Sequence, residues 1–166
     1  MFRVSSLAAL GAFGLLAAVA NGQHAERYGI GCGEKGALSV IDGHVYVTRS
    51  RDADDLWRVE RSARGYTIRL FAGKWRLRYL TGDSKGNVTL AEKPSDGSYW
   101  SLDMEAAERF GKTKVSLHGR KDGPRNLTAG EEMVTIADEN GKEQRAILPK
   151  LTEQAGSNFS ITVISP

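Results

Sequence analysis

Side chains that carry out catalytic or metal chemistry are scattered along this sequence. Its three histidines, His24, His44 and His118, do not have a spacing typical of metal ligands. The chain has no nucleophile-elbow motif, no glycine-rich phosphate-binding loop, and no acidic pair that an obvious cleft would bring together. Because a function has to be argued from a site, we expect a protein that is not an enzyme and that needs no metal and no cofactor.

Three asparagines lie in sequons for N-glycosylation. They are Asn87 in Asn-Val-Thr, Asn126 in Asn-Leu-Thr and Asn158 in Asn-Phe-Ser. In a secreted eukaryotic protein some of these sequons should carry glycans. The alternative is that each asparagine lies at the entrance to a strand because turn chemistry favours asparagine there.

The chain has one cysteine, Cys32, which therefore cannot close an internal disulfide. It lies between Gly31 and Gly33, and a free cysteine usually behaves as a small buried apolar residue. We expect a buried thiol in a monomer. An exposed thiol and a Cys32-linked dimer are the alternatives.

The N-terminal segment 1–20 has the features of a secretory signal peptide. Arg3 supplies a positive charge, a nearly continuous apolar run covers 7–20, and Ala18-Val19-Ala20 is typical of a cleavage site. The apolar run of about 14 residues is shorter than the roughly 20 residues that a membrane-spanning helix needs. The sequence therefore predicts a secreted, extracellular protein without a membrane segment.

The charges give no indication of a nucleic-acid or membrane partner. The chain has 23 basic and 20 acidic residues, which gives a formal net charge of +3, and the two signs are interspersed. This pattern is typical of a solvated surface. After the signal peptide, the remaining length is that of one ordinary domain.

Short apolar runs separated by polar turns predict an all-β domain over 37–166, preceded by a polar, glycine-rich extension over 21–36. Asp42-Gly43 and Asn140-Gly141 each separate two apolar runs, which is a hairpin signal. The segment 103–111 has Met104, Ala107 and Phe110 at a spacing of three, which fits either one or two helical turns or an irregular loop. The predicted strands are 38–41, 45–47, 56–59 and 66–70, then 77–80, 88–90, 99–102 and 114–117, then 126–128, 134–136, 145–148 and 159–163.

These strands form three copies of a four-strand unit with a period of about 45 residues. The two residues of each of three pairs are twelve positions apart. The pairs are Val45 and Trp57, Val88 and Trp100, and Val134 and Ala146. Three units are too few for a β-propeller, whereas a β-trefoil with pseudo-threefold symmetry fits them. On this interpretation Trp57, Trp100 and Ala146 occupy equivalent core positions.

From Ala37 to Ser165 the chain resembles secreted β-trefoils. It lacks the Gln-x-Trp repeat of ricin-type lectins, and Leu56-Trp57-Arg58-Val59 followed by Gly65-Tyr66-Thr67-Ile68-Arg69 is similar to the first repeat of cospin-type inhibitors. The likeness extends to Kunitz-type and mycocypin-type protease inhibitors. It implies a rigid barrel that presents a surface loop to a protease cleft.

Each of these families implies a different inhibitory loop. The cospin pattern implies the loop 48–55, with Arg49 or Arg51 entering the specificity pocket of a trypsin-like protease. The Kunitz position corresponds to 72–76, which contains Lys74, Trp75 and Arg76. A mycocypin-like inhibitor would use 42–43 and 61–65 against a papain-type cleft. The alternative in each case is a solvated charged turn.

The resemblance therefore implies a secreted, non-catalytic protein, one that blocks a serine or cysteine protease and is deployed as an effector on host proteases. A carbohydrate-binding module and a secreted signalling ligand are the alternatives. The regions where the three copies differ, including 49–55, 74–76 and 103–111, are the expected places for function.

Overall fold

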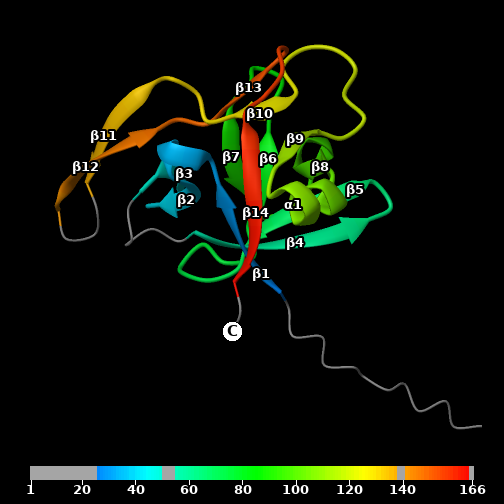
Figure 1. Cartoon of the computed structure of the whole chain (residues 1–166). Coiled ribbons are helices and arrows are strands. Elements are labelled where there is room, and N and C mark those ends of the chain that lie inside the picture. Colours follow the sequence, from blue (N-terminus) through cyan, green and yellow to red (C-terminus); the bar gives the residue numbers. More distant parts are fainter. Residues whose placement is uncertain (1–25, 50–54, 138–140, 165–166) are drawn as a thin grey trace, which may run out of the picture.

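A computed structural model describes residues 26–49, 55–137 and 141–164 (Figure 1). The protein is all-β with one short helix, as the sequence predicts. The predicted signal peptide, 1–20, lies outside the described residues. The elements are β1 Arg27–Gly31, η1 Gly33–Lys35, β2 Ala37–Ile41, β3 His44–Thr48, β4 Leu56–Ser62, β5 Gly65–Leu70, β6 Tyr79–Gly82, β7 Val88–Ala91, η2 Asp96–Ser98, β8 Tyr99–Leu102, α1 Met104–Phe110, β9 Thr113–Leu117, β10 Asn126–Thr128, β11 Met133–Ala137, β12 Glu143–Ile147, β13 Lys150–Thr152 and β14 Asn158–Ile164.

Six strands pair in a closed, antiparallel ring. β1 pairs with β4, β4 with β5, β5 with β8, β8 with β9, β9 with β14, and β14 again with β1. Closure leaves these six strands without a free edge, so their backbone groups are satisfied within the ring. β14 crosses the front of the molecule beside α1 (Figure 1).

A hairpin interrupts the ring three times. β2 and β3 pair between β1 and β4, β6 and β7 pair between β5 and β8, and β10 and β13 pair between β9 and β14. The third hairpin differs from the others because a further hairpin, β11–β12, is inserted between β10 and β13. This inserted hairpin extends to one side (Figure 1), and Ile147 of β12 pairs with Val47 of β3.

The core contains a leucine and an aromatic residue from each copy, and all six side chains are fully buried. The Nε1 group of Trp57 donates to the carbonyl oxygen of Leu38 at 2.8 Å, and that of Trp100 donates to Leu80 at 3.0 Å. Burying each aromatic ring contributes several kcal/mol, and the indole N–H is satisfied at the same time. The six residues are Leu38, Leu80, Leu127, Trp57, Trp100 and Phe159.

The regular structure begins at Arg27, ahead of the predicted start at Ala37. The strand β1 lies within 21–36, which the sequence analysis assigned to an extension, and it pairs with β14 from Arg27↔Ile164 to Gly31↔Ser160. Tyr28 and Ile30 alternate with glycines along it and are buried. The alternation is too short to stand out, and the stabilising partner lies at the other end of the sequence.

The predicted equivalence of Ala146 with the two tryptophans is wrong. Val134 and Ala146 are direct cross-strand partners in the inserted hairpin, so their interval matches the other two pairs by coincidence. Phe159 of β14 fills the third aromatic position instead. The predicted strands 134–136 and 145–148 therefore belong to the insertion, and the third copy is longer than its period suggested.

The segment 103–111 forms a short helix. The Asp103 carboxylate accepts a hydrogen bond from the backbone N–H of Ala106 at 2.9 Å, and Gly111, with φ of 66°, ends the helix in a left-handed conformation. Ala107 is buried against the barrel, whereas Phe110 is 70% exposed. The alternative, an irregular loop pinned by Phe110, is therefore wrong.

Candidate functional site

Of the two arginines in the cospin-type loop, the structure describes only Arg49. The Nε of Arg49 donates to the carbonyl oxygen of Glu34 at 2.6 Å, and its Nη2 contacts the same oxygen. This guanidinium is therefore engaged by the protein's own backbone and would have to leave it to enter a protease pocket. Arg51 lies outside the described residues.

The Kunitz-type candidates lie in the loop 71–78 between β5 and β6, which we call the basic loop. Two backbone hydrogen bonds close its base, from Leu70 N to Arg78 O at 3.0 Å and from Leu77 N to Leu70 O at 2.8 Å. Two more, Arg76 N to Gly73 O and Arg78 N to Trp75 O, both at 3.3 Å, form consecutive turns. The loop is therefore held in one compact conformation.

Trp75 faces inward and anchors the basic loop. It is half-buried against the core, and a Cβ atom added to Gly43 would lie 2.9 Å from its ring. The Lys74 ammonium lies 5.2 Å from the ring centroid and the Arg78 guanidinium 4.9 Å, which are cation–π distances. Of the predicted residues, Lys74 and Trp75 are therefore used largely within the loop itself.

Arg76 and Leu77 form the outward part of the basic loop. Arg76 is exposed, and within the described part of the chain it belongs to no ion pair. Leu77 is 51% exposed and has a φ of 68°. A left-handed backbone costs a leucine about 1 kcal/mol or more, and neither burial nor a turn preference offsets that cost here.

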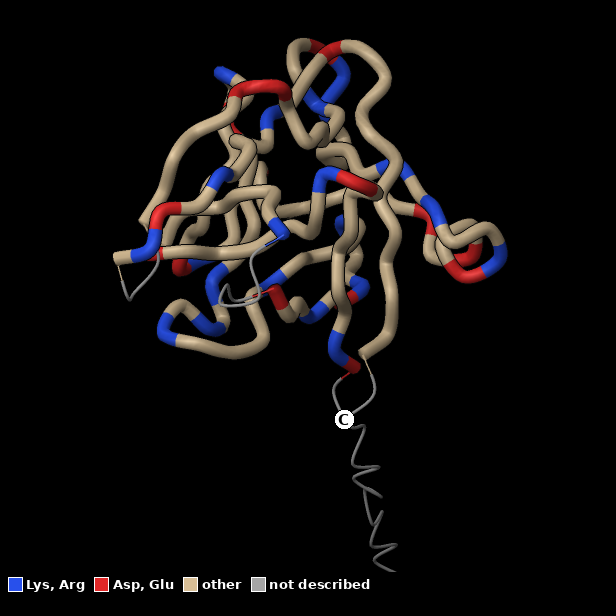
Figure 2. The backbone as a smooth tube through the Cα atoms, turned by 60° about the vertical axis from the view of Figure 1, so that its left-hand side comes forward, with Lys and Arg blue, Asp and Glu red and all other residues tan. Residues whose placement is uncertain are grey.

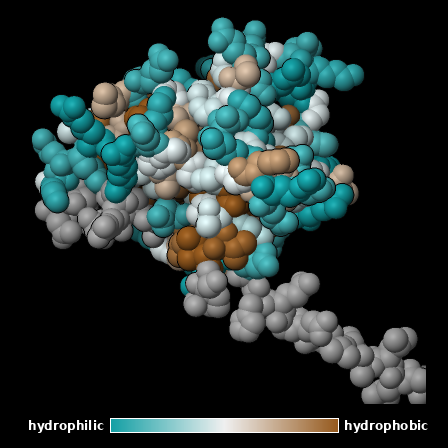
Figure 3. All heavy atoms as spheres, viewed as in Figure 1, coloured by the Kyte–Doolittle hydropathy of each residue, from teal (hydrophilic) through white to brown (hydrophobic). Residues whose placement is uncertain are grey.

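Other exposed apolar side chains lack this backbone feature. Among the described residues they are Phe110, Met133, Val163 and Ile164, all with ordinary φ values. Most of the face in Figure 3 is hydrophilic, with a hydrophobic area beside the C-terminal trace. Figure 2 shows Lys and Arg spread over the molecule among Asp and Glu, as the interspersed charges predict.

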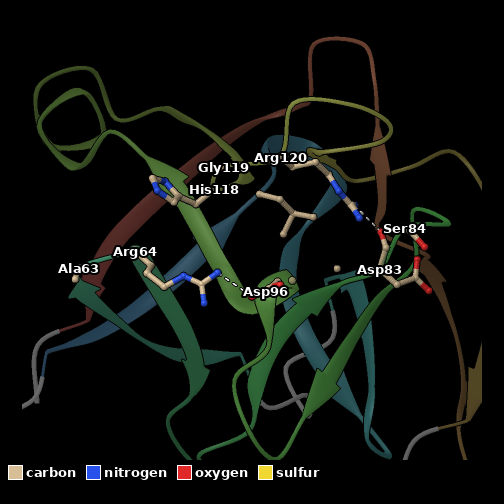
Figure 4. A pocket seen from close by; sticks show the side chains of 11 residues that line it. Ala63, Arg64, Asp83, Ser84, Asp96, His118, Gly119 and Arg120 are labelled. Atoms are coloured by element: carbon tan, nitrogen blue, oxygen red, sulfur yellow. Dashed lines mark hydrogen bonds and ion pairs between the residues drawn. The ribbon is translucent and has the colours of Figure 1, made fainter.

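A second feature is a polar pocket of about 710 Å³ at the opposite end of β5 from the basic loop. It lies between the β4–β5 turn, the end of β6, the turn η2 and the end of β9. Leu117 and three glycines line it together with charged side chains. Arg64 and Arg120 enter from opposite sides, with Asp96 below them and His118 at the rim (Figure 4).

Each charged group of the polar pocket has a partner within the protein. Arg64 Nη2 lies 2.8 Å from Asp96 Oδ1, which raises the pKa of Arg64, and its guanidinium stacks 4.4 Å from the Tyr99 ring centroid. Arg120 Nη1 donates to the carbonyl oxygens of Asp83 at 2.8 Å and Pro124 at 3.0 Å. Both arginines are thus held in place by contacts within the protein.

The remaining polar groups of the pocket are also fixed. The Asp83 carboxylate accepts hydrogen bonds from Asn87 Nδ2 at 2.7 Å, Asn87 N at 2.9 Å and Lys85 N at 2.8 Å. These bonds, led by that of the Asn87 side chain, lower the pKa of Asp83. Nδ1 of His118 lies 3.0 Å from Ser101 Oγ, which orients the imidazole ring.

The structure distinguishes the three sequons. Asn87 Nδ2 is bonded to Asp83, and Asn126 Nδ2 donates to the carbonyl oxygens of Glu153 at 3.3 Å and Gln154 at 2.7 Å. Asn158 is exposed at the first position of β14. A glycan on Asn158 would therefore disturb the fewest contacts of the folded chain.

The prediction of a buried Cys32 thiol is confirmed. Burial raises its pKa, so the thiol stays protonated and weakly nucleophilic near neutral pH. Among the residues that the structure describes, no group of three His, Cys, Asp or Glu side chains is placed to hold a metal ion. No helix in the described ranges has the length and apolar character needed to cross a bilayer.

No known family model matches this chain, and no curated protein matches its sequence significantly. Sequence reasoning found Lys74, Trp75 and Arg76 but missed Leu77, which it placed inside a strand that begins only at Tyr79. It also missed the polar pocket, because four segments distant in the sequence build it.

Proposed function

We propose that this chain is a secreted β-trefoil that inhibits a protease through its basic loop. The trefoil assignment is supported by the closed ring of six strands and by the hairpin that forms every second connection between consecutive ring strands, three times along the chain. Such a barrel holds a surface loop rigidly. Rigid loops bind well because little conformational entropy is lost on binding.

The observation that carries the proposal is the pair Arg76 and Leu77. Leu77 combines an exposed apolar side chain with a strained backbone that the loop-closing hydrogen bonds hold in place, and residues strained in this way cluster at functional sites. Glycine would be favoured at this position if stability alone decided. Arg76 beside it offers the long cationic side chain that the acidic specificity pocket of a trypsin-like serine protease accepts.

The consecutive turns make the basic loop compact. This shape favours a mechanism in which the compact loop blocks the protease cleft, rather than one in which a fully extended, substrate-like backbone enters it. Arg76 would enter the specificity pocket while Leu77 packs on the apolar rim of the cleft. Trp75, which packs against Gly43, would hold the basic loop in this conformation. No bond is made or broken in this mechanism.

Inhibition assays of the mature chain against trypsin-like, subtilisin-like and papain-like proteases test the proposal. We expect inhibition of the trypsin-like enzyme, and Arg76→Ala should weaken it at least roughly tenfold. Arg109→Ala is the matched control, because Arg109 also precedes an exposed apolar residue, Phe110. An absence of inhibition in all three assays would refute the proposal.

Leu77→Gly separates binding from stability. The variant should inhibit more weakly while its free energy of unfolding stays the same or rises by up to about 1 kcal/mol, since glycine tolerates the left-handed backbone. Inhibition that survives both Arg76→Ala and Leu77→Gly but is lost in Arg51→Ala would place the site in the loop 49–55 instead.

A further inference from the structure

We propose that the polar pocket is a second binding site, which takes a neutral oligosaccharide. It is separate from the basic loop, because the two features lie at opposite ends of β5. Its volume of about 710 Å³ falls within the range of small-molecule sites and exceeds what a single ion occupies. The class of ligand follows from the lining groups.

One part of the pocket is lined by Gly82 and Gly97, which carry no side chain. Gly97 approaches the backbone of Gly82 so closely that an added Cβ atom would lie 2.0 Å from the Gly82 carbonyl oxygen. A Cβ on Gly82 would lie 2.5 Å from Leu151 Cδ1. The Cβ positions of both glycines are thus filled by packed protein atoms, and the two residues present their backbone to the pocket beside Leu117. Peptide groups at the surface of a pocket can donate to and accept from the hydroxyl groups of a ligand.

The charges of the walls disfavour an ionic ligand. An anion would meet the Asp96 carboxylate, whose side chain is 93% exposed, and a cation would meet the guanidinium groups of Arg64 and Arg120. Since Arg64 pairs with Asp96, the wall that they form is neutral as a unit. A neutral ligand is not repelled by charges of either sign.

Hydroxyl groups match what the paired groups still offer. A guanidinium has five N–H donors and a carboxylate has two acceptor oxygens, so the Arg64–Asp96 pair leaves donors and an acceptor beside each other. A sugar hydroxyl both donates and accepts, and it can use both at once. Arg120 and His118, fixed by Pro124 and Ser101, add oriented polar groups on the other walls.

Binding of defined oligosaccharides to the full mature chain tests the inference. The neutral probes are chitotetraose, cellotetraose, xylotetraose and mannotetraose, and tetragalacturonate is the anionic comparator. The imidazole NMR signals of His118 report occupation of the pocket. We expect at least one neutral probe to shift these signals, and Asp96→Ala to weaken its binding at least tenfold.

Glu92→Ala is the matched control, because Arg78 and Glu92 form a similar pair at 2.6 Å outside the pocket, and this variant should bind normally. Arg76→Ala should also bind normally, so that failure of the inhibitor proposal and failure of this one are distinguishable. Unchanged amide NMR spectra verify that Asp96→Ala is folded, and Arg64→Ala provides a second test of the same wall. Lack of binding by every neutral probe, or binding of tetragalacturonate alone that survives Asp96→Ala, would overturn the inference.

Discussion

The second and third hairpins share a threonine–serine hydrogen bond, which we call the clamp, but differ in the segment that joins their strands. In the β6–β7 copy, Thr81 Oγ1 lies 2.8 Å from Ser98 Oγ, and in the β10–β13 copy Thr128 Oγ1 lies 2.9 Å from Ser157 Oγ. Only the third hairpin carries the inserted pair β11–β12. The same clamp is thus kept beside two different connections, a short turn in the second hairpin and the inserted hairpin in the third. Loop segments tolerate such variation.

The largest expected effect tests whether the two copies bury equivalent aromatic residues. Trp100→Ala and Phe159→Ala should each lower the free energy of unfolding by about 3–5 kcal/mol, because both side chains are fully buried and would leave cavities. Urea denaturation measures both. A loss below about 1 kcal/mol for Phe159→Ala would mean that β14 does not complete the third copy. Phe110→Ala, at a 70% exposed position, is the control.

The next largest effect on stability is expected at two glycines beside the clamps, where the backbone closely approaches another segment of the chain. A Cβ atom on Gly97 would lie 2.0 Å from the Gly82 carbonyl oxygen, and one on Gly156 would lie 2.3 Å from that of Leu127. Gly97→Ala and Gly156→Ala should therefore each cost about 1–3 kcal/mol of stability. Gly29→Ala is the control, since its Cβ would meet the Ile164 side chain at an ordinary 3.4 Å. Equal thermal midpoints for all three variants would contradict the geometry.

The all-β class and most strands could be predicted because alternation and turn residues are local signals. Asp42-Gly43, for example, does separate β2 from β3. The third copy was misassigned because the inserted hairpin also alternates, and no local signal distinguishes it from a strand pair of the repeat. A better signal was present in Gly97-Ser98-Tyr99-Trp100 and Gly156-Ser157-Asn158-Phe159, where a glycine and a serine precede the aromatic residue at the same spacing.

The candidate sites were less predictable than the fold. Basic residues in 74–76 are visible in the sequence, but the left-handed backbone of Leu77 depends on the hydrogen bonds that close the loop. The polar pocket depends on Arg64 and Arg120, which enter it from segments that are distant in the sequence. The spacing of residues in the sequence does not show that these segments lie together until the strand pairing of the ring is known.

The smallest effect concerns the hydroxyl pairs of the two clamps. Ser98 Oγ also accepts from Ser95 N at 3.1 Å, and Ser157 Oγ accepts from Ala129 N at 3.2 Å, so each serine satisfies a backbone N–H as well as a threonine. Ser98→Ala and Ser157→Ala should each cost about 1–2 kcal/mol. Exposed Ser84→Ala should cost much less and serves as the control.

Double-mutant cycles decide whether the two clamps act alike. Combining Ser98→Ala with Thr81→Val, and Ser157→Ala with Thr128→Val, should give coupling energies of about 0.5–1 kcal/mol in both copies. Coupling in the second copy alone would mean that the inserted hairpin has taken over the role of the clamp in the third. Coupling of similar size in both would mean that the third hairpin keeps the same clamp as the second, although the insertion begins close to Thr128, the last residue of β10.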